Sequence, residues 1–184
     1  MPVYVSVFPI FDSVADGVDA KEWIAVKMGD IYSELSVLCN AISDFCTSER
    51  CPIMRAGPYY EYAWAETGSS EYAVPTIVSA RKYMELLMSW VDSNLTQLSN
   101  ESQLNTGWFN INLKIFCRRS FRIYAHIFAE HFEETKPIHR YLRYSLLHFL
   151  IFMNEFGLLV TSTEIEPIKH VVASLGIPNL NFTN

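Results

Sequence analysis

The stretch CTSERCPIMRAGPYYEYAW, from Cys46 to Trp64, decides how this 184-residue sequence is interpreted. Two cysteines, Cys46 and Cys51, are separated by four residues, and Pro52, a Gly-Pro pair and a run of aromatic residues follow. Proline and glycine favour turns and irregular backbone. The stretch is therefore predicted to be a loop that something else holds in place, and the cysteine pair is the first candidate for that role.

A second pair of ligand-type side chains lies in FRIYAHIFAEHF, which contains His126 and His131. Two cysteines and two histidines are a common ligand set for structural zinc, and both spacings lie within or at the edge of the usual ones. The alternative, that each pair consists of ordinary core or surface residues, stays open at this point. On an ideal helix the two histidines point about 140° apart, so we expect a helix break or distortion near Ala129–Glu130.

Composition indicates the cellular compartment of the protein and the classes of molecule that it binds. Half of the residues are hydrophobic, as in a folded domain, and the net charge of −6 argues against general nucleic-acid binding. The longest apolar run, SLLHFLIFM, is too short to span a membrane, and the N-terminal residues lack the basic flank of a signal peptide. We expect a cytoplasmic protein, with the nucleus as a second compartment, where a C-x4-C pair is more often a metal site than a disulfide.

Hydrophobic periodicity predicts a mainly α-helical single domain. Helices are expected to begin at Asp19, after Ser79, near Asn110, at Pro137, and after Ser162 or Thr163. PYYEYAW and YAVPTIV predict a small β-hairpin, and SNLTQLSNESQLNTG predicts a loop. The core faces of the first and the long helix are predicted to include Ile24, Ile31, Leu35, Leu38, Ile42, Phe45, Ile111, Ile115, Phe116, Ile123 and Ile127.

The long helix also carries a basic stripe. Lys114, Arg118 and Arg122 recur at every fourth position, and Arg119 lies beside them. The planar fork of arginine suits phosphate, and a cluster supplies several charge-assisted hydrogen bonds. The alternative is a solvated helix face without a ligand.

The first helix carries acidic residues instead. Glu22, Asp30 and Glu34 are predicted to fall along one side of it. Such a surface suits a basic partner, because complementary charge speeds encounter and sets partner choice. The alternative is that acidic residues simply favour the N-terminus of a helix.

Several segments together resemble the MOB family of kinase coactivators. They are EWIAV, DFCTSERCPIMRAGPYYEYAWA, KYMELLMSW, FRIYAHIFAEHF and NEFGLL, in register from about Asp19 to about Leu175. The resemblance implies a MOB domain over residues 18–184 with a four-helix core. Residues 1–17 form a divergent extension that does not resemble the regulatory N-terminal region of longer family members.

The resemblance also implies a structural zinc ion bound by Cys46, Cys51, His126 and His131. A site with four protein ligands leaves no open position for water or substrate, so it is not expected to be catalytic. A zinc hydrolase, with Glu130 as an acidic base, is the alternative from a different functional class.

MOB proteins are non-enzymatic adaptors that bind and activate kinases of the NDR/LATS type, and some bind phosphorylated segments of upstream Hippo-type kinases. The resemblance thus implies a kinase coactivator in Hippo-type signalling and mitosis, whose partners are such a kinase and a phosphorylated upstream kinase or scaffold. It assigns phosphopeptide binding to the basic stripe and kinase binding to the acidic residues Glu22, Asp30 and Glu34. A phosphopeptide adaptor that does not activate kinases is the alternative within the same class.

Overall fold

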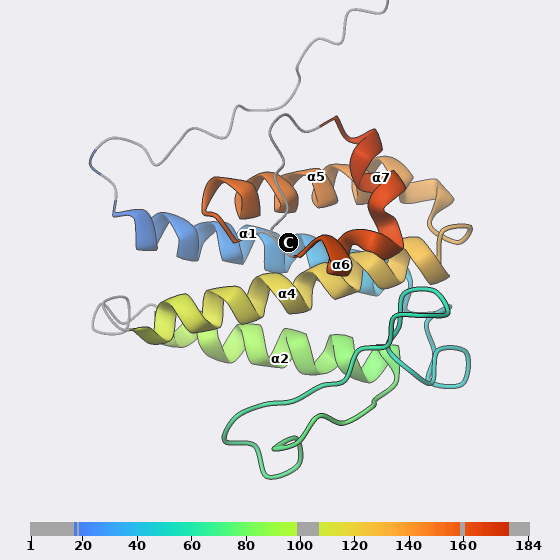
Figure 1. Cartoon of the computed structure of the whole chain (residues 1–184), viewed down its shortest axis with the longest axis horizontal. Helices are drawn as coiled ribbons and strands as arrows, with labels where there is room; N and C mark the ends of the chain where they lie inside the picture. The colour runs from blue at the N-terminus through green and yellow to red at the C-terminus, as the bar shows by residue number, and fades with distance from the viewer. Residues whose placement is uncertain (1–16, 18, 99–106, 159–160, 177–184) are drawn as a thin grey trace, which may run out of the picture.

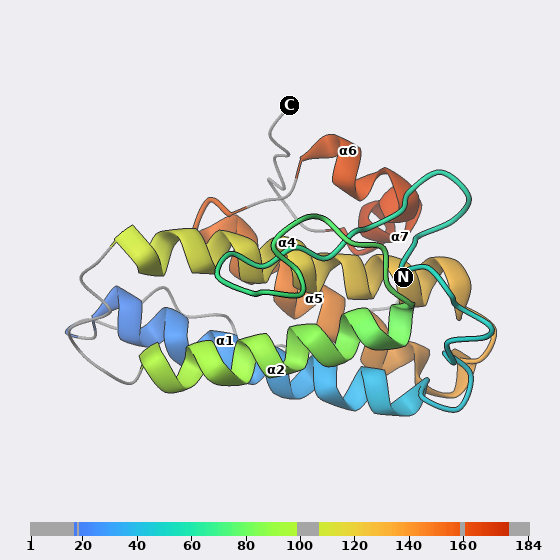
Figure 2. The ribbon, with the colours of Figure 1, turned by 90° about the horizontal axis from the view of Figure 1, so that it is seen from below.

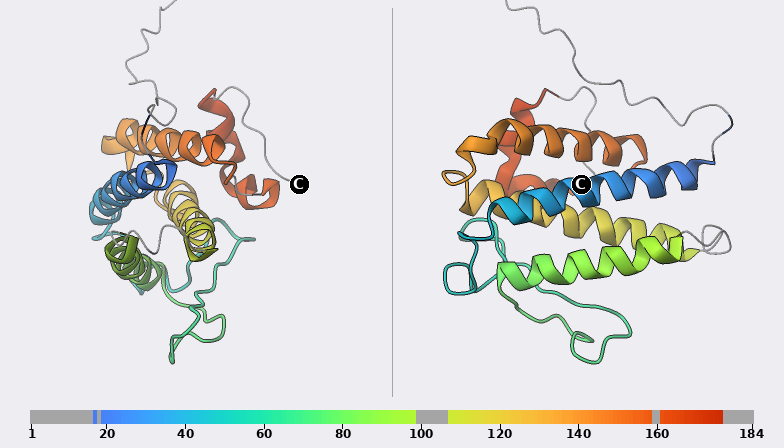
Figure 3. Two further views of the ribbon diagram at one scale, coloured as in Figure 1. Left: turned by 90° about the vertical axis from the view of Figure 1, so that its left-hand side faces the viewer. Right: turned by 180° about the vertical axis from the view of Figure 1, so that it is seen from behind.

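Four long helices form the core of the computed structural model, which describes residues 17, 19–98, 107–158 and 161–176. They are α1 (Ala20–Ala41), α2 (Ala80–Leu98), α4 (Gly107–Glu130) and α5 (His139–Glu155) (Figure 1). Viewed end-on they surround a common centre (Figure 3, left). The short elements α6 (Ser162–Ile165), η2 (Glu166–Ile168) and α7 (Lys169–Ser174) follow α5, and η2 packs on α4. The prediction of a mainly helical fold is confirmed.

Helix α1 follows its sequence pattern closely. The Asp19 side chain accepts hydrogen bonds from the backbone N–H groups of Lys21 and Glu22, at 2.8 and 3.4 Å, and so caps the N-terminus. Its buried residues recur every three or four positions: Ile24, Met28, Ile31, Leu35 and Leu38. Phe45 was predicted to face the core, but it is 41% exposed because the helix ends at Ala41 and the periodicity is lost beyond it.

Two features of α2 and α4 differ from the sequence prediction. Residues 93–98 were predicted as part of a loop but continue α2. The side chains of Ser93, Asn94 and Thr96 bond back to carbonyls one turn earlier, as Ser93 does to Ser89 at 2.9 Å. The rest of that predicted loop, residues 99–106, lies outside the described residues. Ile111 was predicted to face the core but is 62% exposed, whereas Phe116, Ile123 and Ile127 are buried.

The predicted hairpin is only partly present. Among the described residues no regular strand forms, and the segment between α1 and α2 contains two isolated antiparallel bridges, Arg55 with Glu61 and Trp64 with Thr76. Trp64 and Thr76 exchange both backbone hydrogen bonds, at 2.9 and 2.8 Å, but Pro75 has no N–H to donate to a longer ladder. The segment crosses the outer side of α2 and α4 (Figure 2), where Trp64 is buried against Tyr83 of α2.

The C-terminal elements begin close to their predicted starts. Pro137 lies in the short helix η1 (Lys136–Ile138), which leads into α5, and Gly157 follows the end of α5 with φ 63°. The cap of α6 is Thr161, one residue before the predicted Ser162, and it forms a reciprocal capping box with Glu164. In the described parts of the chain, no helix has both the length and the apolarity that a membrane crossing requires.

Candidate functional site: a metal centre and a basic cluster

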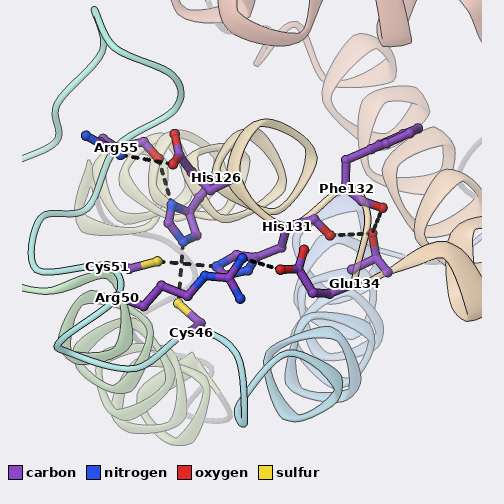
Figure 4. A network of polar contacts seen from close by, with 10 residues as sticks. Cys46, Arg50, Cys51, Arg55, His126, His131, Phe132 and Glu134 are labelled. Carbon is purple, nitrogen blue, oxygen red and sulfur yellow. Dashed lines mark hydrogen bonds and ion pairs between the residues drawn. The ribbon is translucent and has the colours of Figure 1, made fainter.

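The structure brings together the four side chains predicted to bind zinc. Cys46, Cys51, His126 and His131 are all buried, and their ligand atoms lie within 4.8 Å of one another (Figure 4). The cysteines lie at either end of one helical turn after α1, where Cys51 N–H donates to the Thr47 carbonyl at 2.8 Å. His126 belongs to the last turns of α4, and His131 is the first residue beyond it. The predicted helix break between the two histidines is therefore confirmed.

The distances within the cluster fit a tetrahedral metal ion. Cys46 Sγ lies 3.4 Å from His126 Nε2, and Cys51 Sγ lies 3.4 Å from His131 Nε2. Zinc binds sulfur at about 2.3 Å and imidazole nitrogen at about 2.0–2.1 Å, which places tetrahedral S and N ligands about 3.6 Å apart. Two sulfur and two nitrogen donors would fill the four coordination positions of a structural zinc ion and leave no open position for a substrate.

The protonation of the cluster also suits a metal ligand set. Burial lowers the pKa of His126 to about 4, so its imidazole is neutral. Its Nδ1–H donates to the Arg55 carbonyl at 2.7 Å, which leaves Nε2 unprotonated and directed at the cysteines. Burial, reinforced by the neighbouring Cys51, raises the pKa of Cys46 to about 12. A divalent cation would supply the positive charge that favours the two thiolates in this buried environment.

A second layer of charged residues surrounds the cluster. The Glu130 carboxylate accepts the backbone N–H of Gly57 at 2.8 Å and forms an ion pair with Arg55 at 3.3 Å. Glu134 forms an ion pair with Arg50, which lies between the two cysteines in the sequence (Figure 4). Glu130 was considered as the base of a zinc hydrolase, but its carboxylate is used to hold the loop that carries Arg55 and Gly57.

The predicted basic stripe on α4 is divided between two environments. Lys114 and Arg118 are exposed, and Arg118 Nε pairs with the Glu164 carboxylate of α6 at 3.2 Å. Arg122, the third residue of the stripe, is half-buried instead. Its Nη1 donates to the Tyr83 hydroxyl at 3.2 Å, and its guanidinium lies over the Tyr62 ring, 5.0 Å from the centroid.

Arg119 lies inside the protein rather than beside the stripe. It is 9% exposed, and its guanidinium lies 3.8 Å from the Trp64 ring centroid and 4.9 Å from that of Trp90. It also donates a hydrogen bond to the Ala65 carbonyl. Arginine is weakly hydrated and stacks well on aromatic faces, which explains why it can occupy this position.

The three acidic residues predicted on one side of α1 do not share a surface. Glu22 and Asp30 are exposed, and Asp30 pairs with Lys27 at 3.3 Å. The Glu34 side chain is only 15% exposed and faces α5, where it bonds to Ser145 and His148 at 2.7 and 2.6 Å. The exposed acidic surface of α1 is therefore smaller than predicted, because the carboxylate of Glu34 has partners inside the bundle.

Sequence reasoning missed the residues that surround the arginines. Tyr62 and Tyr83 flank Arg122, and Glu164 lies against Arg118. The alternation in YEYAW was a signal for Tyr62 and Trp64, since both are buried and the residues between and before them are not. No signal in the sequence connected Glu164, near the C-terminus, with α4.

Known proteins are similar to this chain over most of its length. The Mob1/phocein family model matches residues 13–168. "MOB kinase activator-like 1A" of Arabidopsis thaliana is 36% identical over 171 residues, covering 88% of this chain and 77% of the relative. "MOB kinase activator-like 1 homolog A" of Dictyostelium discoideum is 37% identical over 172 residues, covering 89% and 78%. Human "MOB kinase activator 3A" is 32% identical over 168 residues, covering 86% and 75%.

The names of these relatives describe regulators of kinases rather than catalysts. The match also confirms the resemblance inferred from the sequence motifs, and it includes both ligand pairs and all of α4. The chain belongs to the Mob1/phocein family.

Proposed function

We propose that this protein is a non-enzymatic coactivator and adaptor of NDR/LATS-type kinases, acting in Hippo-type signalling and mitosis in the cytoplasm and nucleus. The observation that carries the proposal is the family match, which covers residues 13–168 and includes relatives named kinase activators. The closed four-donor cluster supports a regulatory role, since it offers no open metal position for chemistry.

Zinc, in this proposal, is a structural cofactor bound by Cys46, Cys51, His126 and His131. The tetrahedral spacing of the donors and the hydrogen bond that fixes the His126 tautomer support it. Glu130 is engaged with Gly57 and Arg55, which argues against the hydrolase alternative.

The kinase is proposed to contact α1 through a basic segment. Glu22 and Asp30 are the exposed acidic residues that support this surface, and Glu34 is left out because it faces α5. Exposed charges of this kind act chiefly on the rate of encounter.

A direct test uses a purified NDR/LATS-type kinase with its N-terminal regulatory segment. The protein should bind the kinase and raise its activity toward a peptide substrate. Asp30→Lys should slow association at low salt and have less effect at high salt, whereas the same change at exposed Glu133 should not. Binding without a rise in activity would favour the adaptor alternative, and the absence of binding would contradict the kinase half of the proposal.

The basic cluster is proposed to bind a phosphorylated segment of an upstream kinase or scaffold. Lys114, Arg118 and Arg122 provide the cationic surface, and Arg119 supports it from inside by its contacts with two tryptophans. A phosphate monoester carries close to two negative charges at neutral pH and three acceptor oxygens, which suits several arginine donors.

Matched phosphorylated and unphosphorylated peptides test this site. Arg118→Ala with Arg122→Ala should abolish the preference for the phosphorylated form, and Arg122→Ala should cost more than Lys114→Ala because it removes forked hydrogen bonds as well as charge. Arg140→Ala, on an exposed part of α5, is the control. If the double variant is folded and still prefers the phosphopeptide, these arginines do not bind it.

A further inference from the structure

Several buried polar atoms in and next to the basic cluster have no hydrogen-bond partner among the described residues, and two of them belong to residues that contact each other. The Tyr62 hydroxyl and Arg122 Nε are shielded from solvent and make no hydrogen bond to any described residue. Tyr62 is 8% exposed, and the Arg122 guanidinium lies over its ring. A buried donor without a partner costs free energy and calls for an explanation, such as a ligand that is bound only part of the time.

These atoms are suited to an anion. Burial raises the pKa of Tyr62 to about 12, with Arg122 opposing the rise and the Tyr83 and Glu164 groups adding to it, so the hydroxyl keeps its proton and can donate it. Arg122 uses Nη1 on the Tyr83 hydroxyl, which leaves Nε available as a second charged donor. The two unpartnered donors thus belong to residues that contact each other, and one of them carries the positive charge.

An anion from the protein itself already lies at this place. The Glu164 carboxylate pairs with Arg118 Nε at 3.2 Å, and the same carboxylate accepts the backbone N–H of Thr161 at 3.1 Å in the capping box. Arg118 and Arg122 are one turn apart on α4. The Glu164 carboxylate therefore lies close to the residues that carry the two unpartnered donors, the Tyr62 hydroxyl and Arg122 Nε.

We propose that Glu164 is the resident anion of the phosphate site and that Tyr62 is one of the site's ligands. A phosphate monoester on a peptide replaces Glu164 at Arg118 and accepts hydrogen bonds from the Tyr62 hydroxyl and Arg122 Nε. This inference rests on the proposed phosphopeptide binding and adds an internal competitor and a further ligand to it. Tetrahedral phosphate, with more acceptor oxygens than a carboxylate, is the class of ligand that the three donors favour.

The capping box permits a clean test of Glu164. Glu164→Gln removes the charge but can keep the reciprocal hydrogen bond, since glutamine serves at that position of a capping box. Glu166→Gln, two residues later and paired only with Lys169 among the ion pairs described, is the matched control. Against a degenerate phosphothreonine peptide library and against inorganic phosphate, Glu164→Gln should bind about two- to fivefold more tightly, the size expected for an exposed ion pair, and Glu166→Gln should match the wild type.

Tyr62 is tested with Tyr62→Phe, which removes one unpartnered hydroxyl and keeps the ring. Because that hydroxyl has no hydrogen-bond partner among the described residues, thermal stability should stay unchanged or improve and metal content should not change. Affinity for the phosphopeptide should fall roughly tenfold. Tyr60→Phe, in the same loop, is the control. A merely structural role for Tyr62 would move stability and leave the phosphate preference intact.

The outcomes separate this inference from the function on which it rests. Tighter binding by Glu164→Gln together with weaker binding by Tyr62→Phe supports it. Wild-type preference for the phosphopeptide that neither change alters overturns the inference and leaves the proposed function in place. No phosphate preference in the wild type or in Glu164→Gln overturns both.

Discussion

At the scale of single residues, the carboxylate of Glu34 links three helices. It accepts the Ser145 hydroxyl at 2.7 Å and bonds to His148 Nδ1 at 2.6 Å, both on α5. Because the Ser145 hydroxyl donates its hydrogen bond to Glu34, it accepts a hydrogen bond from the Tyr124 hydroxyl of α4, at 2.7 Å. Burial raises the pKa of Tyr124 well above its ordinary value, which keeps that hydroxyl a donor. The chain of hydrogen bonds therefore runs from α4 through α5 to α1.

Glu34→Ala should destabilise the fold by about 2–4 kcal/mol, because it removes the buried carboxylate that accepts from the Ser145 hydroxyl and bonds to His148. Urea unfolding monitored by circular dichroism measures the change. Asp30→Ala, one turn earlier and exposed, should stay within about 0.5 kcal/mol. Equal effects of the two substitutions would show that the network contributes nothing beyond a surface charge.

The placement of Glu34 also shows where sequence reasoning reaches its limit. Spacing along α1 predicts which residues share a face, and four of the residues predicted to face the core, Ile24, Ile31, Leu35 and Leu38, are buried, whereas buried Met28 was not predicted. It does not predict whether a polar residue at the edge of that face is buried or exposed. For Glu34 this depends on Ser145 and His148, which are 111 and 114 positions away in the sequence. Arg119 and Arg122 turned inward for the same reason: their aromatic partners come from another segment.

At the scale of elements, the end of α4 positions the loop between α1 and α2. The helix stops at Glu130, which places His131 in the metal cluster and leaves the Glu130 carboxylate on the loop at Arg55 and Gly57. The helix end was predictable, because two histidines five positions apart cannot share a metal on an ideal helix. The incomplete hairpin could not be predicted from the sequence, because the pairing of its two segments is decided by the packing of Trp64 on α2 and on Arg119 of α4.

Glu130→Ala should loosen this loop without unfolding the bundle. Loss of the hydrogen bond to Gly57 and of the ion pair to Arg55 should speed amide hydrogen exchange in residues 52–60 by roughly tenfold, which corresponds to about 1.4 kcal/mol of local stability. Mass spectrometry of exchanged peptides gives the measurement.

Glu133→Ala is the control for that change. Glu133 is exposed and pairs with Lys136 beyond the end of α4, so its removal should leave exchange in the loop unaltered. Unchanged exchange in both variants would mean that the metal ligands alone hold the loop.

At the scale of the whole molecule, the four ligands join two distant parts of the chain. Each cysteine faces a histidine 80 positions away, so a bound metal ties the end of α1 to the end of α4. Because the ligands are not arranged in the unfolded chain, the free energy of metal binding becomes free energy of folding.

Metal analysis of the purified protein should find one zinc ion per chain. Chelation, or His126→Ala, should lower the melting temperature by about 10–20 °C, which corresponds to a loss of about 5 kcal/mol in a domain of this size. His170→Ala, an exposed histidine outside the cluster, should change neither zinc content nor melting. A metal-free protein that melts at the same temperature after chelation would rule out the structural zinc.

The separation of the ligands by 80 positions also has a consequence for synthesis on the ribosome. The cysteine pair leaves the exit tunnel early and can hold a metal ion with only half of its ligands. Until His131 has followed, the loop after α1 has no fixed anchor, and its aromatic residues remain available for wrong contacts. At about 5–20 residues per second, translation keeps the nascent chain in that condition for several seconds. Truncated chains that end before α4 is complete should therefore be the ones that chaperones retain.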